Sequence, residues 1–248
     1  MMTDLTKLLR FLQKNRVNIN SVEEMLGITR LNLRNNHLTT LPKKLGNLTK
    51  LEYLNLYDNN LTTLPPEIGN LINLEKLYLS GINLTTLPKE IGNLINLKEL
   101  NLSNNRLSTL PKEIGNLINL KKLGLGFNIL TTLPSEIGNL VNLKELGLGI
   151  NNLTTLPAEF GNLTSLNYIG LSHNNFTNLP LGIDKLSKDL FPDYLHKYYD
   201  ESVKFRKAVK IIERAWMAYD WIPNSEGIAR CALRSFRELQ ESNPEIFS

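Results

Sequence analysis

The stretch LKELNLSNNRLSTLPKEIGNLIN, residues 97–119, decides the fold because close copies of it fill most of the chain. The copies follow one another every 23 residues, and a fixed period of this length is typical of repeat architectures. Seven units can be aligned, and they begin at Ile28, Leu51, Leu74, Leu97, Leu120, Leu143 and Leu166. The sequence therefore predicts a solenoid over residues 28–188.

The fourth unit shows how one coil is built. Leu100 and Leu102 alternate with polar residues, which is the period of a β-strand. Pro111 cannot donate to a strand ladder, and Gly115 is expected to take a turn conformation that is closed to other residues. Asn105 follows the strand, where its amide can satisfy backbone groups at the bend. One coil cannot bury its own apolar side, so stacked coils are predicted to share a continuous core.

An asparagine follows the strand in every unit except one. The counterparts of Asn105 are Asn36, Asn59, Asn128, Asn151 and Asn174. In the third unit this position is Ile82, which predicts an interruption of a hydrogen-bonded column along the solenoid. Either neighbouring groups or water satisfy the turn at that point, or the solenoid bends or weakens there.

These units resemble the leucine-rich repeat family over residues 28–188. The LPxEIGNLxNL part is similar to the 23-residue class found in Ras-binding and Scribble-like intracellular scaffolds and in bacterial repeat proteins. The resemblance implies an α/β solenoid, a horseshoe of seven repeats with a parallel sheet on its concave side. The C-terminal tail resembles, more loosely, the tails of leucine-rich repeat proteins from giant viruses.

Both ends of a solenoid expose apolar core and need caps. Residues 1–27 are predicted to be a helical N-terminal cap, because leucines recur at helical spacing and Ser21 with Glu24 has the spacing of a capping box. Residues 189–248 also have helical periodicity, with one helix expected from about Asp200 to Tyr219 and a second from about Ser225. We expect this αα-hairpin to be either a C-terminal cap or a separate docking module.

The composition limits the cellular compartments and the classes of partner that we expect. The only cysteine, Cys231, excludes an intramolecular disulfide, and no apolar run approaches the ~20 residues of a membrane span. We therefore expect an intracellular, cytoplasmic protein, or one in the host cytoplasm if a virus or an intracellular bacterium encodes it. The net charge of +4 is spread along the chain, which disfavours nucleic acid as a partner.

No pattern in the sequence indicates catalysis. His37, His173 and His196 are isolated, no paired Cys or His has metal-ligand spacing, and no phosphate-binding glycine loop occurs. We therefore expect neither an enzyme nor a bound cofactor or metal. Residues 209–221 include VKIIERAWMAY, which is similar to an IQ motif, but the glutamine and the later basic residue are missing. Calmodulin binding is therefore not expected.

Two stretches, LGLGFN (123–128) and LGLGIN (146–151), place glycine where strand side chains should point outward. Glycine in a strand costs roughly 0.5–1 kcal/mol, and a close backbone approach by a partner would explain it. The predicted trench and its wall comprise Gly124, Gly126, Phe127, Gly147, Gly149, Ile150, Gly170 and His173, and a second cluster comprises Tyr53, Tyr57 and Tyr78. The competing interpretation is that near-identical repeats duplicated a harmless glycine pair.

The resulting hypothesis is a non-catalytic scaffold that binds a protein partner on its concave face. Two alternatives stay open at this point. One is a substrate-targeting adaptor, similar to those of ubiquitin ligases, that recruits an enzyme through the C-terminal helices. The other is a receptor for a glycan or another non-protein ligand, which the tyrosine cluster would permit.

Overall fold

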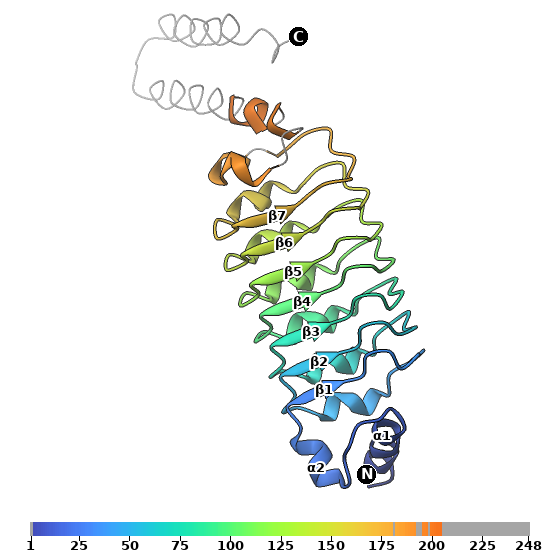
Figure 1. Cartoon of the computed structure of the whole chain (residues 1–248). Helices are drawn as coiled ribbons and strands as arrows, with labels where there is room; N and C mark the ends of the chain where they lie inside the picture. Colours follow the sequence, from blue (N-terminus) through green and yellow to red (C-terminus); the bar gives the residue numbers. More distant parts are fainter. Residues whose placement is uncertain (1, 181, 192–194, 198, 205–248) are drawn as a thin grey trace, which may run out of the picture.

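The computed structural model describes residues 2–180, 182–191, 195–197 and 199–204, and it shows a stack of coils with one coil per repeat (Figure 1). Each coil adds one short strand to a single parallel sheet, and the strand order is the chain order. The strands are β1 (Arg30–Asn32), β2 (Tyr53–Asn55), β3 (Lys76–Tyr78), β4 (Glu99–Asn101), β5 (Lys122–Gly124), β6 (Glu145–Gly147) and β7 (Tyr168–Gly170). The predicted solenoid is confirmed.

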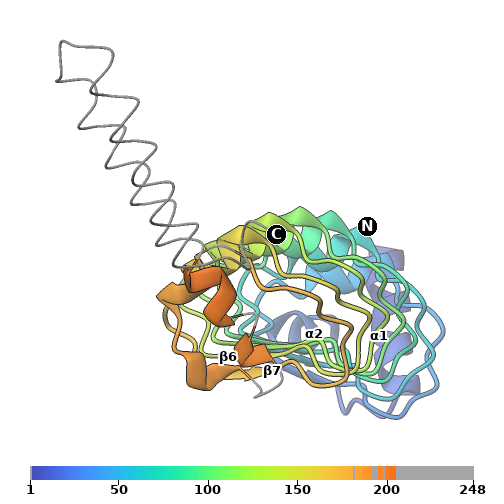
Figure 2. The ribbon, with the colours of Figure 1, turned by 90° about the horizontal axis from the view of Figure 1, so that it is seen from above.

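Short 3-10 helical turns form another side of the coils, away from the strands (Figure 2). They are η1 (Lys43–Asn47), η2 (Pro66–Asn70), η3 (Lys89–Asn93), η4 (Lys112–Asn116), η5 (Ser135–Asn139), η6 (Ala158–Asn162), η7 (Ile183–Lys185) and η8 (Lys188–Leu190). A proline precedes each of η1 to η6 with a φ between −65° and −68°. Because its ring fixes φ, this proline keeps the chain extended until the turn begins.

The strand register stacks apolar residues into one core. The central residue of each strand pairs with the central residue of the next, as Leu31 does with Leu54. These central residues are at most 7% exposed, and they are Leu31, Leu54, Leu77, Leu100, Leu123, Leu146 and Ile169. A single coil could not bury them, so the stack buries them together.

The asparagine column joins each coil to the one before it. The side-chain oxygen of Asn128 accepts a hydrogen bond from Leu107 N at 3.0 Å, and its Nδ2 donates to Leu102 O at 3.0 Å and to Leu125 O at 2.9 Å. The same bridge between coils is made by Asn59, Asn105, Asn151 and Asn174.

The third unit breaks this column, as its sequence predicts. Ile82 is fully buried and has no side-chain group that could accept a hydrogen bond from Leu61 N, the counterpart of Leu107 N. Gly81 and Asn83, on either side of Ile82, have left-handed backbones with φ of 68° and 64°. The second and third coils are therefore joined without the asparagine bridge.

The glycine in the turn of a coil is needed for a different physical reason from the one that the sequence suggested. Among the described glycines, Gly81 and Gly182 have positive φ, whereas Gly115 does not. A Cβ atom on Gly115 would lie 2.4 Å from the carbonyl oxygen of Glu136 in the next coil. The expectation of a special turn conformation at Gly115 is therefore wrong, because close packing between successive coils is what requires glycine.

Two helices precede the first strand, α1 (Met2–Lys14) and α2 (Val22–Gly27). Leu8 and Leu12 of α1 are buried, and α1 packs against α2 and η1. Ser21 caps α2, since its hydroxyl accepts a hydrogen bond from Glu24 N at 3.0 Å. Leu8, Leu12 and Met25 belong to the same buried apolar core as the leucines of the first coil.

At the other end, two polar contacts attach residues 199–202 to the last coil. The hydroxyl of Tyr199 donates to Leu186 O at 2.8 Å, and the hydroxyl of Ser202 donates to Leu179 O at 2.6 Å. Most of the predicted hairpin, including residues 209–221 and Cys231, lies outside the described residues. Within the described ranges, none of the helices combines the length and the apolar character that a membrane crossing needs.

Candidate functional site

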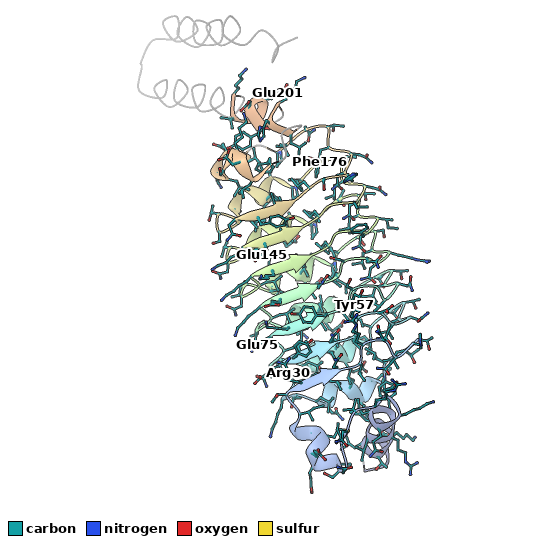
Figure 3. All side chains as sticks on the ribbon, viewed as in Figure 1. Arg30, Tyr57, Glu75, Glu145, Phe176 and Glu201 are labelled. Atoms are coloured by element: carbon teal, nitrogen blue, oxygen red, sulfur yellow. The ribbon has the colours of Figure 1, made fainter. Side chains whose placement is uncertain are left out.

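Two rows of side chains flank the buried row of the sheet and form its outer side, which we call the sheet face. The register aligns one row as Arg30, Tyr53, Lys76, Glu99, Lys122, Glu145 and Tyr168. It aligns the other as Asn32, Asn55, Tyr78, Asn101, Gly124, Gly147 and Gly170. In Figure 3, Arg30 and Glu145 of the first row are labelled along this face.

The sheet face contains a pocket of about 230 Å³ over β3 to β7. Gly124 and Gly147 are on its floor, and Tyr78 and Tyr168 mark its two ends along the sheet. Charged residues of the first row, Glu99, Lys122 and Glu145, line one side, and Asn101 and Ser103 line the other. The pocket therefore includes part of the predicted trench and several residues that were not predicted.

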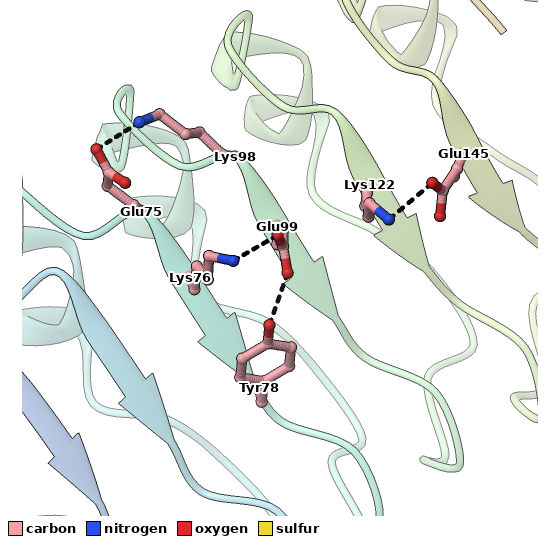
Figure 4. Close-up of polar contacts among 7 residues, drawn as sticks. All are labelled: Glu75, Lys76, Tyr78, Lys98, Glu99, Lys122 and Glu145. Atoms are coloured by element: carbon pink, nitrogen blue, oxygen red, sulfur yellow. Dashed lines mark hydrogen bonds and ion pairs between the residues drawn. The ribbon is translucent and has the colours of Figure 1, made fainter.

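The charges around the pocket are paired with one another (Figure 4). Glu99 accepts from Lys76 Nζ at 2.7 Å and from the hydroxyl of Tyr78 at 2.6 Å, and Lys122 lies 2.7 Å from Glu145. Burial opposes the ionisation of Glu99, but the hydrogen bonds from Lys76 and Tyr78 lower its pKa below the ordinary 4.5. Burial, together with the bond to Glu99, raises the pKa of Tyr78 to about 12.

This network predicts a pH dependence of stability. The pKa of Glu99 is lower in the folded than in the unfolded chain. Its contribution to stability is therefore complete above pH 4.5 and is lost as the pH falls through the pKa of the folded chain. Glu99→Gln should therefore be less stable than wild type at neutral pH, and the difference should vanish in acid. Urea unfolding across this range measures it, and a difference that is independent of pH would refute the assignment.

Of the three tyrosines predicted as one cluster, two have rings in contact and the third is stacked against an arginine. The rings of Tyr53 and Tyr78 lie 5.6 Å apart, whereas the ring of Tyr57 is covered by Arg34 at 4.6 Å. Arg30 lies 4.2 Å from the ring of Tyr53. Of the three, Tyr78 lines the pocket, and Tyr53 and Tyr57 lie outside it.

The trench glycines are not required by backbone conformation. None of Gly124, Gly126, Gly147, Gly149 and Gly170 has a positive φ. A Cβ atom on Gly147 would meet nothing closer than the Cα of Gly124 at 3.9 Å, whereas one on Gly124 would lie 3.0 Å from Asn101 Oδ1 and Ser103 Oγ. The fold would accept a side chain at Gly147, and its absence keeps the pocket floor open.

The predicted wall of the trench has an unusual backbone. Phe127, Ile150 and His173 have left-handed φ of 57°, 57° and 56°. Their counterparts in the first four coils are Asn35, Asp58, Gly81 and Asn104, which are residue types that adopt this conformation readily. Phe127 is 58% exposed and Ile150 is 39% exposed. Two bulky side chains are thus exposed beside the glycines at a cost of roughly 1–3 kcal/mol each in backbone strain.

Ile150→Asn is expected to raise the free energy of unfolding by about 1 kcal/mol, because asparagine tolerates the left-handed backbone better than a β-branched residue. Ile129→Asn is the matched control, since Ile129 is also aliphatic and 49% exposed but does not have a positive φ. Urea unfolding of both variants measures the difference. If Ile150→Asn were no more stable than Ile129→Asn, left-handed strain at Ile150 would be disproved.

Three of the eleven predicted residues line the pocket and the other eight do not. Gly124, Gly147 and Tyr78 line the pocket, while Phe127 and Ile150 form an apolar edge that is not part of its lining. Sequence reasoning missed Glu99, Asn101, Ser103, Lys122, Glu145 and Tyr168 as pocket residues. The available signal was the 23-residue register, which places Lys122 and Glu145 two positions before Gly124 and Gly147.

Solved structures with similar folds include bacterial and plant proteins. A leucine-rich repeat protein from Leptospira interrogans is 42% identical, with a TM-score of 0.52 over 66% of this chain and 47% of its own. The plant peptide hormone receptor RGFR1, in complex with RGF2, is 33% identical, with a TM-score of 0.51 over 65% of this chain and 32% of its own.

A third similar structure is the leucine-rich repeat ectodomain of the receptor kinase GASSHO1/SCHENGEN3 from Arabidopsis thaliana, in complex with CASPARIAN STRIP INTEGRITY FACTOR 2. It is 26% identical, with a TM-score of 0.58 over 72% of this chain and 28% of its own. The matched region spans less than half the length of each of these three proteins. The search of curated proteins found no match.

The family comparison agrees with the coil geometry. The family described as leucine-rich repeat region matches residues 4–132 and 67–167, which together cover most of the stack. The repeat period, the single parallel sheet and the asparagine bridges are all accounted for by this match. The chain belongs to the leucine-rich repeat family.

Proposed function

We propose that this protein is a non-catalytic binding protein whose sheet face, together with the adjacent edge formed by Phe127 and Ile150, takes an extended segment of a protein partner. The pair Phe127 and Ile150 carries the proposal, because both side chains are exposed in strained, left-handed backbone. Strain that persists at an exposed position supports a functional role there. Duplication of a repeat would copy such residues, but it would not compensate for the backbone strain that they introduce.

The geometry around this pair suits a bound chain. Phe127 N donates a hydrogen bond to Gly149 O at 2.9 Å, so Phe127 and Ile150 lie on adjacent coils that are hydrogen-bonded to each other. Gly126 and Gly149 directly precede Phe127 and Ile150, and they leave the neighbouring backbone bare. An apolar side chain of a partner would be buried between Phe127 and Ile150 while its backbone lies over the glycines.

The similar solved structures support this class of function. Two of them are plant receptors in complex with a second component, RGF2 in one case and CASPARIAN STRIP INTEGRITY FACTOR 2 in the other. Those binding properties belong to those proteins, of which this chain matches about a third or less. They make a binding role the first one to test.

Gly147→Arg is expected to abolish capture of the partner and leave thermal stability nearly unchanged. The new side chain would fill the face, and its Cβ atom has no neighbour closer than 3.9 Å. Affinity capture from a lysate with mass spectrometry compares this variant with wild type. The matched control is Ser135→Arg, which adds the same charge on η5, where other units have Lys43, Lys89 and Lys112.

The double variant Phe127→Asn, Ile150→Asn tests the apolar edge directly. A partner retained by wild type and by Ser135→Arg, but by neither Gly147→Arg nor the double variant, would support the proposal. Equal retention by all four proteins would show that the sheet face is not the binding surface.

We further propose that residues 1–27 and 189–248 cap the repeats of residues 28–188. The contacts of α1 with η1, and the bonds from Tyr199 and Ser202 to the last coil, support this division. An adaptor role for the tail would depend on residues outside the described ranges, whereas the binding role depends on the sheet face.

A further inference from the structure

We infer that the pocket on the sheet face is a subsite for one neutral sugar ring. Its volume of about 230 Å³ is below the roughly 300–1,000 Å³ of pockets for drug-sized ligands, so it suits a single ring. Phe127 and Ile150 do not line it, so this inference goes beyond the proposed protein-binding role and does not rest on it.

Charge balance argues for a neutral ligand. Glu99 is paired with Lys76 and Glu145 with Lys122, so the carboxylates around the pocket are already matched by ammonium groups. A cationic ligand would compete with Lys122, and an anionic ligand would approach both glutamates. A hydroxyl group can donate to a carboxylate and accept from an ammonium, so a polyhydroxylated ring can bond to the pairs without disturbing them.

Uncommitted polar groups lie beside these pairs. Within the described chain, the hydroxyl groups of Ser103 and Tyr168 make no hydrogen bond to protein, and neither does Asn101 Nδ2. Asn101 Oδ1 accepts from Ser103 N at 3.0 Å, which orients the amide with Nδ2 free to donate. Together they offer the donors and acceptors that several hydroxyl groups on one ring would need.

Tyr168 supplies an aromatic surface at one end of the pocket. It is 59% exposed, and its hydroxyl lies 3.3 Å from the position that a Cβ atom of Gly170 would occupy. The ring therefore lies over the space that Gly170 leaves and keeps the rest of its surface open. An aromatic ring with a polar tip matches the C–H face and the hydroxyl edge of a sugar.

Saturation-transfer NMR with the full chain tests this inference directly. The probes are methyl glycosides of glucose, galactose, mannose and N-acetylglucosamine at millimolar concentrations, with methyl glucuronide and glucosamine as charged analogues. We expect transfer to at least one neutral glycoside and weaker transfer to the charged analogues. A peptide carrying a glucosylated serine distinguishes the source, since tighter binding than the methyl glycoside would indicate a sugar attached to a partner.

Two variants locate the site. Tyr168→Ala removes the aromatic surface, and Gly147→Val fills the floor at a position where the fold has room. Each should weaken the transfer at least about tenfold. Tyr57→Ala, which removes a half-exposed tyrosine outside the pocket, should leave it unchanged. Absence of transfer to every neutral glycoside, or equal transfer to wild type, Tyr168→Ala and Gly147→Val, would overturn the inference and leave the protein-binding proposal intact.

Discussion

Gly115→Ala is expected to lower the free energy of unfolding by about 3 kcal/mol, whereas Gly147→Ala should leave it unchanged or raise it slightly. The same methyl group meets opposite surroundings in the two cases. On Gly115 it would lie 2.4 Å from the Glu136 carbonyl oxygen and 2.7 Å from Glu136 Cβ. On Gly147 its nearest neighbour would be 3.9 Å away.

The clash at Gly115 involves backbone, so rotation of a side chain cannot relieve it. The fifth coil would have to move away from the fourth, and the loss of core packing between them would add to the cost. Urea unfolding followed by circular dichroism compares both variants with wild type. Equal stability of Gly115→Ala and Gly147→Ala would show that the coils do not pack as closely as described.

Asn128→Ala is expected to lower the free energy of unfolding by about 2–3 kcal/mol. The buried amide of Leu107 would lose its acceptor, and leaving a buried polar group unpaired costs roughly 1–3 kcal/mol. The carbonyl groups of Leu102 and Leu125 would each lose one donor, but Asn105 and Asn151 also donate to them. The loss should therefore come chiefly from the orphaned amide and the small cavity.

The matched control is Asn152→Ala, which removes the exposed asparagine that follows Asn151, the counterpart of Asn128 in the next coil. It should change stability by no more than about 0.5 kcal/mol, as is usual for a surface substitution. Unfolding in urea measures both variants. The bridging role of the asparagine column would be refuted if Asn128→Ala and Asn152→Ala were equally stable.

The fold could be predicted because every coil has the same pattern of residues that determine its local structure. Leucine at strand period, proline before the turn and asparagine after the strand recur at one interval, so an error in reading one unit is corrected by the others. The interruption at Ile82 was predictable for the same reason. The role of Gly115 was not, because the contact that excludes a side chain comes from Glu136 in the next coil.

The candidate site was predictable only in part. The 23-residue period shows which residues share a row of the sheet, and it predicted Gly124 and Gly147 as site residues. It does not show that Tyr78 bonds to Glu99 rather than joining a cluster with Tyr57, because that depends on side-chain direction. Nor does it show backbone angles, so the strain at Ile150 could be seen only in the structure.

The break in the asparagine column has a mechanical consequence. The strand ladder and the asparagine bridges connect coil to coil along the stack, so a force pulling its two ends apart loads the joints in series. Among the seven described repeats, each joint has an asparagine bridge except the one between the second and third coils, where Ile82 stands. Under tension the stack should yield first at that joint, which separates the coils of Tyr53 and Tyr57 from those that build the pocket.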